Sequence, residues 1–236
     1  TVAGTTTTTS TSTGTSTSAT LALTADHDSD SDHTWDTSKE VTIDLSNPTA
    51  TDGVTVKDGV ITITAAGAYR LSGTLADGQV VVDTEDSGSV YLILDNASIT
   101  NSDGSAIVID KADLALIVLA DGTTNTVTDG SSYAATGDDD PNAAIWSDPN
   151  LTILGEGSLT VNGNYNDGIN SSDGLVIVSG TITVTAKDDG LRGKDYLVIK
   201  DGTVTVTSGG DSLKSDNEED SGLGYVSVAA GTVTLD

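Results

Sequence analysis

The chain has 236 residues, of which 36% are hydrophobic, and carries a formal net charge of −27 from 36 acidic and 9 basic residues. This acidity argues against nucleic acid or an anionic membrane as a direct partner and makes cations the expected ligands. Cysteine is absent, which excludes disulfides, thiolate chemistry and Cys-ligated zinc. No apolar run is long enough to span a bilayer, and the length accommodates one elongated domain.

Residues 1–25 form an N-terminal arm or linker rich in Ser and Thr. This composition is typical of a spacer that tethers a domain to a surface. Thr is β-branched and favours extended backbone, so Thr5–Thr17 could instead be donated as a strand to a sheet edge. The chain does not begin with Met, which is what a processed product would show.

The segment from Asp26 to Asp36 alternates acids with Ser and His. It resembles a calcium loop, but position 6 counted from Asp28 is His33 rather than Gly, and position 12 is Lys39 rather than a carboxylate. A solvated acidic loop is the alternative interpretation.

Residues 26–236 are predicted to form the folded domain, built from short strands separated by turn residues such as Asp-Gly. No segment has a sustained apolar period of 3.6 residues, so helix should be nearly absent. In Thr181–Thr185 and Thr203–Thr207 the apolar residues alternate with Thr, which predicts that the apolar side chains point inward. Acidic loop insertions are expected near 131–149 and 215–224. The predicted strands before the first insertion are Val41–Leu45, Val54–Val56, Val60–Ile63, Tyr69–Leu71, Val80–Val82, Val90–Leu94, Ala106–Ile109 and Leu114–Leu119.

A fixed interval of 22 residues separates Asp167, Asp189 and Asp211, and their neighbours align as well. A repeat of this length, rich in Val, Ile, Thr and Gly, indicates an all-β parallel β-solenoid with rungs of about 22 residues. Neighbouring strands lie about 4.8 Å apart, so equal spacing stacks carboxylate on carboxylate. Unpaired like charges at that separation repel one another, and the column therefore requires a cation.

Calcium, which prefers oxygen ligands, is one candidate for that cation. The predicted ligands form two columns six residues apart, together with adjacent oxygens: Asp167, Asp188, Asp189 and Asp211, then Asp173, Asp195, Asp216 and Asn217. The alternative is neutralisation by the protein's own basic groups, because Arg192 and Lys214 align in a third column with Lys187 and Lys194 nearby.

The turns Asn166–Asn170, Asp188–Asp195 and Gly210–Asn217 resemble the signature of bacterial cell-surface carbohydrate-binding β-helix proteins. Similar matches occur upstream, at Ser72–Asp83 and at Asn142–Ser147. The resemblance extends from about Asp28 to Asp236 and implies a right-handed, single-stranded parallel β-helix that binds Ca²⁺ and an acidic polysaccharide such as polygalacturonate. It also implies a secreted protein, associated with the cell surface or matrix.

An acidic protein needs cations to hold an acidic polymer. Bound Ca²⁺ could bridge protein and sugar carboxylates, while Arg192, Lys194 and Lys214 contact uronates directly and Tyr165 supplies an aromatic surface. We therefore expect a non-catalytic binding protein.

Three other functions are compatible with the sequence. A filament subunit would use Thr5–Thr17 and the open final rung Gly231–Asp236, whose backbone groups lack a partner strand. A pectate-lyase-like enzyme would use Arg192 as its base. An ice-binding protein would use the stacked Thr-X-Thr triplets, although ordinary β-propensity explains these more simply.

Overall fold

The computed structural model describes residues 23–134, 137 and 140–236. The predicted strand arm Thr5–Thr17 lies outside these residues. Within them, the protein consists of strands and two short 3₁₀ helices, η1 (Asp30–His33) and η2 (Thr37–Lys39), which confirms the expectation of little helix. None of the helices in the described part of the chain is long and apolar enough to cross a membrane.

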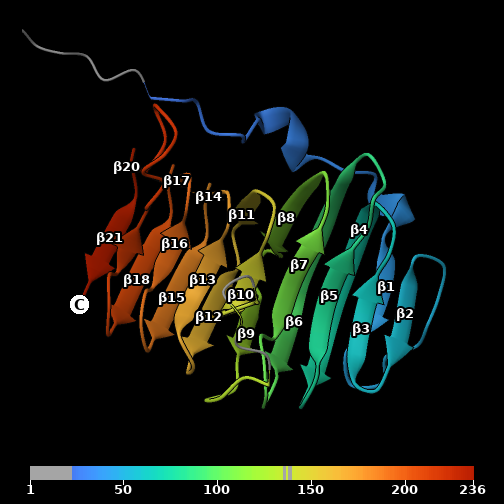
Figure 1. Ribbon diagram of the computed structural model, residues 1–236. Coiled ribbons are helices and arrows are strands. Elements are labelled where there is room, and N and C mark those ends of the chain that lie inside the picture. The colour runs from blue at the N-terminus through green and yellow to red at the C-terminus, as the bar shows by residue number, and fades with distance from the viewer. Residues whose placement is uncertain (1–22, 135–136, 138–139) are drawn as a thin grey trace, which may run out of the picture.

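The strands form two sheets (Figure 1). The larger sheet has 13 strands, eleven of them in one path from β20 through β6 to β21. Its strands are β1 (Val41–Asp44), β4 (Gly67–Leu75), β6 (Ser89–Thr100), β8 (Leu114–Leu119), β9 (Thr124–Thr128), β11 (Leu151–Gly155), β12 (Ser158–Gly163), β14 (Gly174–Ile177), β15 (Thr181–Ala186), β17 (Tyr196–Ile199), β18 (Thr203–Ser208), β20 (Tyr225–Val228) and β21 (Thr232–Leu235).

The second sheet has eight strands in the order β19-β16-β13-β10-β7-β5-β3-β2. It is mixed, because β2 and β3 pair in antiparallel fashion while the other pairs are parallel. Its strands are β2 (Val54–Lys57), β3 (Val60–Ile63), β5 (Gln79–Asp83), β7 (Ile107–Lys111), β10 (Ala143–Ser147), β13 (Asp167–Ser171), β16 (Leu191–Gly193) and β19 (Leu213–Lys214).

The larger sheet curls because its long strands bend and serve both of its halves. In β6, residues 89–94 pair with β8, whereas residues 98–100 pair with β9. The bend falls at Asn96, which has φ of 55°, in the left-handed region that Asn tolerates better than most residues. In β4 the register shifts between Leu71 and Gly73, and Gly73 has φ of 86°. The eleven strands therefore form a curled, half-barrel-like sheet.

The predicted single-stranded β-helix with rungs of about 22 residues is wrong, since the strands form this curled parallel sheet and a separate mixed sheet. The interval of 22 residues holds between β13, β16 and β19 and between β15 and β18. It fails elsewhere: Leu151 pairs with Ala115 and Ser158 pairs with Thr124, which are far longer steps. A repeat visible in three turns was extended to a whole chain that does not keep it.

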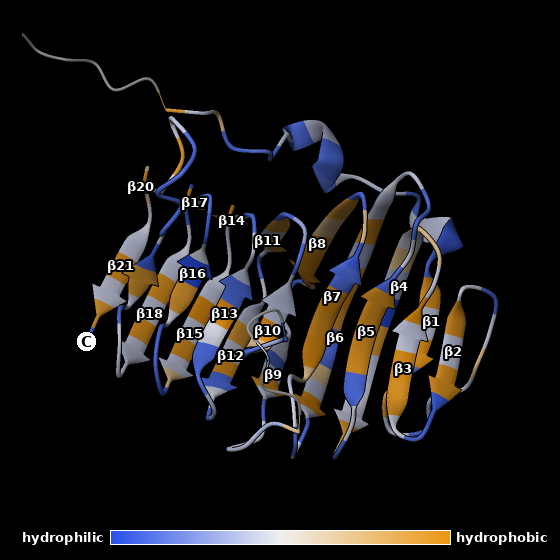
Figure 2. Cartoon of the chain, viewed as in Figure 1, coloured by the Kyte–Doolittle hydropathy of each residue, from blue (hydrophilic) through white to orange (hydrophobic). Residues whose placement is uncertain are grey.

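The core lies between the two sheets and consists of stacked aliphatic side chains. Ile182, Val184, Val204 and Val206 are at most 1% exposed, as their alternation with Thr predicts. The same alternation is visible along the strands in Figure 2. Burial of such rows on a parallel sheet removes apolar area from water at about 25 cal/mol per Å², which fixes the register of every strand pair.

Candidate functional site

Strand register places four polar or aromatic residues side by side on the outer face of the second sheet. Trp146 of β10 pairs with Asn170 of β13, Asn170 with Arg192 of β16, and Arg192 with Lys214 of β19. Their chain neighbours point to the opposite face, where Ile145, Ile169 and Leu191 are fully buried. The predicted alignment of Arg192 with Lys214 is therefore present, and Asn170 and Trp146 continue the same row.

The stacked aspartates at the start of these strands are held by backbone groups as well as by a cation. The Asp189 N–H donates to Oδ1 of Asp167 at 3.2 Å, and the Asp211 N–H donates to Oδ1 of Asp189 at 2.8 Å. Nζ of Lys214 lies 2.7 Å from Oδ2 of Asp189. Each carboxylate thus accepts the N–H of the corresponding aspartate on the next strand, and the local structure itself explains part of the repeat.

Three carboxylates converge at this end of the sheet. Asp167, Asp188 and Asp189 each offer an oxygen, and these oxygens lie within 4.8 Å of one another. Asp167 and Asp189 are buried, whereas Asp188 is exposed. Burial, together with repulsion from Asp189, raises the pKa of Asp167 to about 6. Three oxygens with one open side form a partial ligand set for a hard cation.

The other predicted ligands do not join this trio. Asp173, Asp195 and Asn217 stack at the opposite ends of β13 and β16, where the Asp195 N–H donates to the Asp173 carbonyl and Nδ2 of Asn217 donates to Oδ1 of Asp195. Burial and the charge of Asp195 raise the pKa of Asp173. Asp216 instead accepts from Arg192 through both carboxylate oxygens, with Nη2 at 2.9 Å from Oδ2. The eight predicted ligands therefore occupy at least two separate places.

The predicted sugar-contacting residues differ in how they are engaged. Arg192 and Lys214 are half-buried and ion-paired. Lys194 is exposed, and no carboxylate of the described residues lies within 4 Å of its amine. Tyr165 stacks on Tyr133 with ring centroids 4.2 Å apart. At least one face of the Tyr165 ring is therefore occupied by protein.

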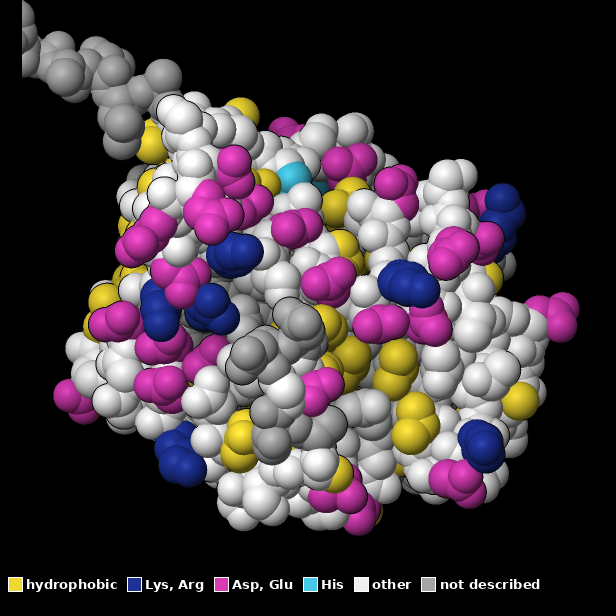
Figure 3. Space-filling model, in the orientation of Figure 1, with side chains coloured by type: hydrophobic (Ala, Val, Ile, Leu, Met, Phe, Trp, Pro, Cys, Tyr) yellow, Lys and Arg dark blue, Asp and Glu magenta, His cyan; other side chains and the backbone are white. Residues whose placement is uncertain are grey.

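A cavity of about 320 Å³ opens beside this row of residues. Figure 3 shows Lys and Arg side chains gathered among acidic ones on this face, next to a hydrophobic area. The sequence patterns that predicted the calcium columns did not point to Trp146 or Asn170 as site residues. Trp146 was visible as a rare aromatic residue in a predicted match, but nothing in the order of residues indicated Asn170. The cavity is lined by Asp140, Asn142, Trp146, Asp148, Asn170, Ser172, Arg192 and Lys194.

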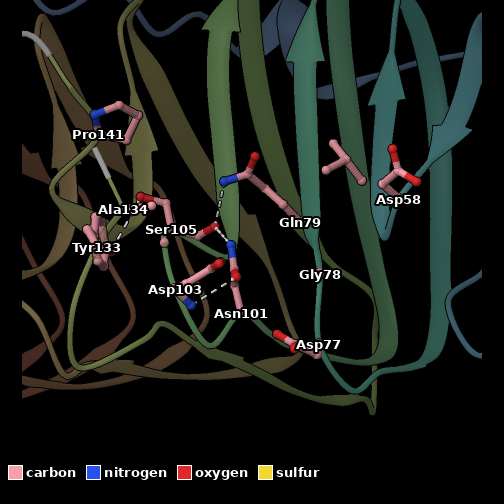
Figure 4. A pocket seen from close by; sticks show the side chains of 12 residues that line it. Asp58, Asp77, Gly78, Gln79, Asn101, Asp103, Ser105, Tyr133, Ala134 and Pro141 are labelled. Carbon is pink, nitrogen blue, oxygen red and sulfur yellow. Dashed lines mark hydrogen bonds between the residues drawn. The ribbon is translucent and has the colours of Figure 1, made fainter. Parts of the chain in front are cut away.

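A second cavity, of about 360 Å³, lies near the starts of β5 and β7 (Figure 4). Nε2 of Gln79 and Nδ2 of Asn101 both donate to the Ser105 carbonyl at 2.8 Å, which fixes the two amides. Carboxylates of Asp58, Asp77 and Asp103 are also in its lining. Pro141 borders this cavity and Asp140 borders the first, so the predicted insertion near 131–149 lies between them.

The acidic N-terminal segment is not a solvated loop throughout, because its central residue is buried. The side chain of Asp28 is 1% exposed and accepts hydrogen bonds from His33 Nε2 at 2.8 Å and Lys200 Nζ at 2.9 Å. His27 lies within 2.9 Å of both Thr152 Oγ1 in β11 and Tyr196 Oη in β17. We call residues 24–36 the N-terminal strap, since they fasten onto the outer face of the larger sheet.

Known proteins with a similar sequence or structure agree on one family. A family model described as carbohydrate-binding domain-containing protein matches residues 57–236. A carbohydrate-binding domain-containing protein of Acetivibrio thermocellus is 40% identical over 206 residues, covering 86% of this chain and 72% of the relative.

A solved structure described as a polysaccharide lyase-like protein from C. thermocellum, in a gadolinium derivative, is similar with a TM-score of 0.79 and 38% identity. The match covers 83% of this chain and 81% of that protein. This similarity agrees with the two-sheet architecture. By the extent of the family match and the identity with its relative, the chain belongs to the family of carbohydrate-binding domain-containing proteins.

Proposed function

We propose that this protein is a secreted, non-catalytic binder of acidic polysaccharide of the polygalacturonate type, and that calcium is needed for binding. The observation that carries the proposal is the convergence of Asp167, Asp188 and Asp189 next to the basic residues Arg192, Lys194 and Lys214. Membership of a carbohydrate-binding family supplies the general function.

Charge explains why calcium would be required. A chain of net charge −27 repels a polyuronate at long range, and the basic groups near the site are too few to reverse this. An ion held by the trio keeps coordination positions open for sugar oxygens, because calcium takes six to eight ligands. The similar solved protein was studied as a gadolinium derivative. Gd³⁺ is also a hard, oxygen-seeking ion, so that description is in keeping with the proposal.

The state of Arg192 supports a binding role rather than lyase chemistry. A lyase base must accept a proton from the sugar, and the guanidinium of Arg192 is held in a bidentate ion pair with Asp216. This pair stabilises the charged form, which has no lone pair to offer. Incubation with polygalacturonate in calcium should therefore give no unsaturated product absorbing in the ultraviolet. Appearance of that product would replace the proposal with an enzymatic one.

The direct test is retention on immobilised polygalacturonate. Wild-type protein should be retained in calcium and released by a chelator, whereas neutral galactan should not retain it. Asp188→Asn should lose most of the calcium-dependent retention, since it removes the exposed member of the trio. Asp58→Asn, an exposed acid on the turn between β2 and β3, is the matched control and should bind as wild type. Retention unaffected by chelator would contradict the role of calcium.

A filament subunit is the second candidate, favoured by exposed apolar residues at one end of the larger sheet. Val226 and Val228 of β20 and Leu235 of β21 are 43%, 49% and 48% exposed, on strands whose outer edges pair with no described strand. Such edges accept further strands. Sedimentation at increasing protein concentration should then show growing assemblies that Val228→Lys abolishes. A constant monomer mass would exclude this candidate.

A further inference from the structure

The cavity beside Trp146 contains a buried acceptor that has no donor. The side chain of Asn170 is among the buried polar groups, 2% exposed, and its Oδ1 has no hydrogen-bond partner among the described residues. Buried side-chain oxygens in folded proteins nearly always have a donor, so each exception asks for an explanation. Asn170 lines the first cavity, where a ligand group can supply one.

A chain of hydrogen bonds fixes which atom of Asn170 is left without a partner. Nδ2 of Asn142 donates to Oδ2 of Asp167 at 3.4 Å, and Nδ2 of Asn170 donates to Oδ1 of Asn142 at 2.7 Å. An ionised carboxylate only accepts hydrogen bonds, so Asn142 must turn its NH₂ group toward Asp167 and its oxygen toward Asn170. Asn170 must then turn its own NH₂ group toward Asn142. Its Oδ1 consequently points away from this chain and remains an acceptor.

The remaining groups in the cavity indicate what kind of ligand would donate to that oxygen. Asp140 and Asp148 balance Arg192 and Lys194, so the cavity has no net charge that would favour a free cation or a small anion. Its charges are also segregated, because Asp140 and Asp148 flank β10 whereas Arg192 and Lys194 lie in and just after β16. Trp146 and Arg192 flank Asn170 on the neighbouring strands. A ligand with hydroxyl donors, an apolar ring edge and one acidic group matches this arrangement.

We propose that this cavity is a subsite for a single uronic acid residue, in which a ring hydroxyl donates to Oδ1 of Asn170 and the sugar carboxylate lies against Lys194 and Arg192. This assignment rests on the proposed function and locates one sugar unit of the polymer on the protein. Asn142 acts as a positioning residue, because it orients Asn170 without lining up with the acidic group. A volume of about 320 Å³ accommodates one pyranose with its substituents.

The test compares two amide removals of the same size. Asn170→Leu keeps the side-chain shape and removes the acceptor, while Asn162→Leu removes an amide of β12 on the other sheet, where Asn162 donates to Thr128. Lys194→Met is a second variant, at an exposed position where folding is not at risk. Binding of trigalacturonate and of its fully methyl-esterified form is measured by calorimetry at saturating calcium, with circular dichroism to verify folding.

Wild type and Asn162→Leu should bind trigalacturonate equally, whereas Asn170→Leu should bind it about tenfold more weakly. Lys194→Met should weaken binding of the acid and leave binding of the ester unchanged, because only the acid carries the charge that Lys194 meets. Wild-type retention on the polymer with equal trigalacturonate affinity in all variants would overturn the subsite while leaving the proposed function intact. Failure of wild type to be retained on the polymer at all would overturn both.

Discussion

The ammonium group of Lys214 lies 2.7 Å from the Asp189 carboxylate, on the neighbouring strand of the same sheet. Asp189 is also a member of the acidic trio, so Lys214 and a bound cation would compete for its charge. The protein's own basic group and calcium are therefore not exclusive alternatives. Lys214 partly satisfies the site when calcium is absent.

This competition predicts that Lys214→Met binds calcium more tightly, by roughly three- to tenfold at low ionic strength. Lys214 is partly exposed, so salt should reduce the gain. Calorimetric titration with calcium measures the change. Lys57→Met serves as control, because Lys57 lies on β2, far along the sheet order from β19. Equal affinities for wild type and Lys214→Met would place the calcium away from Asp189.

Calcium affinity should also fall with acidity. Burial raises the pKa of Asp167 to about 6, and a proton on this carboxyl would have to leave before a metal could bind. The dissociation constant should rise by up to tenfold for each pH unit below about 6 and change little above 7. Titrations between pH 5 and 8 would show this, and a flat profile would exclude Asp167 as a ligand.

The same raised pKa has the opposite effect on the metal-free protein. Because the folded-state pKa of Asp167 lies above its ordinary value of 3.8, the stability that this group contributes is fully present below about 3.8 and is lost as the pH rises through about 6. Added calcium should reverse the trend above pH 6. Thermal melts with calcium and with chelator would separate the two cases.

The N-terminal strap should depend on Asp28. Burial of this carboxyl opposes its ionisation, but hydrogen bonds from His33 and Lys200 outweigh burial and hold its pKa below the ordinary value. Asp28→Ala should cost roughly 2–3 kcal/mol of unfolding free energy, because it leaves Lys200 with Asp26 as its remaining ion-pair partner.

Urea unfolding at neutral pH measures that loss, and hydrogen exchange should show residues 24–36 losing protection first. The contribution of Asp28 should be present above its ordinary pKa of 3.8 and disappear as the pH falls below it. Asp30→Ala, in the exposed part of the same segment, is the matched control. A local loss of protection without any change in unfolding free energy would show that the strap contributes little to global stability.

Asn142 offers a test of the hydrogen-bond chain that is independent of its end point. Asn142→Leu removes the group that orients Asn170, so the Asn170 amide can rotate and present its NH₂ group to the cavity. Trigalacturonate should bind several-fold more weakly, while calcium binding should change little, since Asn142 donates to Asp167 without belonging to the trio. If the affinity for trigalacturonate is unchanged, Asn142 has no positioning role.

Much of the local structure could be predicted from the order of residues alone. Alternation of Ile182 and Val184 with Thr was enough to place these side chains inside, and the interval between Asp167 and Asp189 was enough to place them on neighbouring strands. Both predictions depend on a period of two along a strand and on equal lengths of chain between strands. These are local quantities that a sequence displays directly.

Other features depend on contacts between residues that are far apart in the chain. The curl of the larger sheet arises where β6 pairs with β8 at one end and β9 at the other, and the strap is fastened by the contact of Asp28 with Lys200. The unpartnered oxygen of Asn170 exists because Asp167, Asn142 and Asn170 meet in one chain of hydrogen bonds. The sequence by itself determined which residues face inward and which acids stack. Only the tertiary structure decided how the sheets divide and which polar atom lacks a donor, because both result from the relative position of strands whose spacing along the chain is irregular.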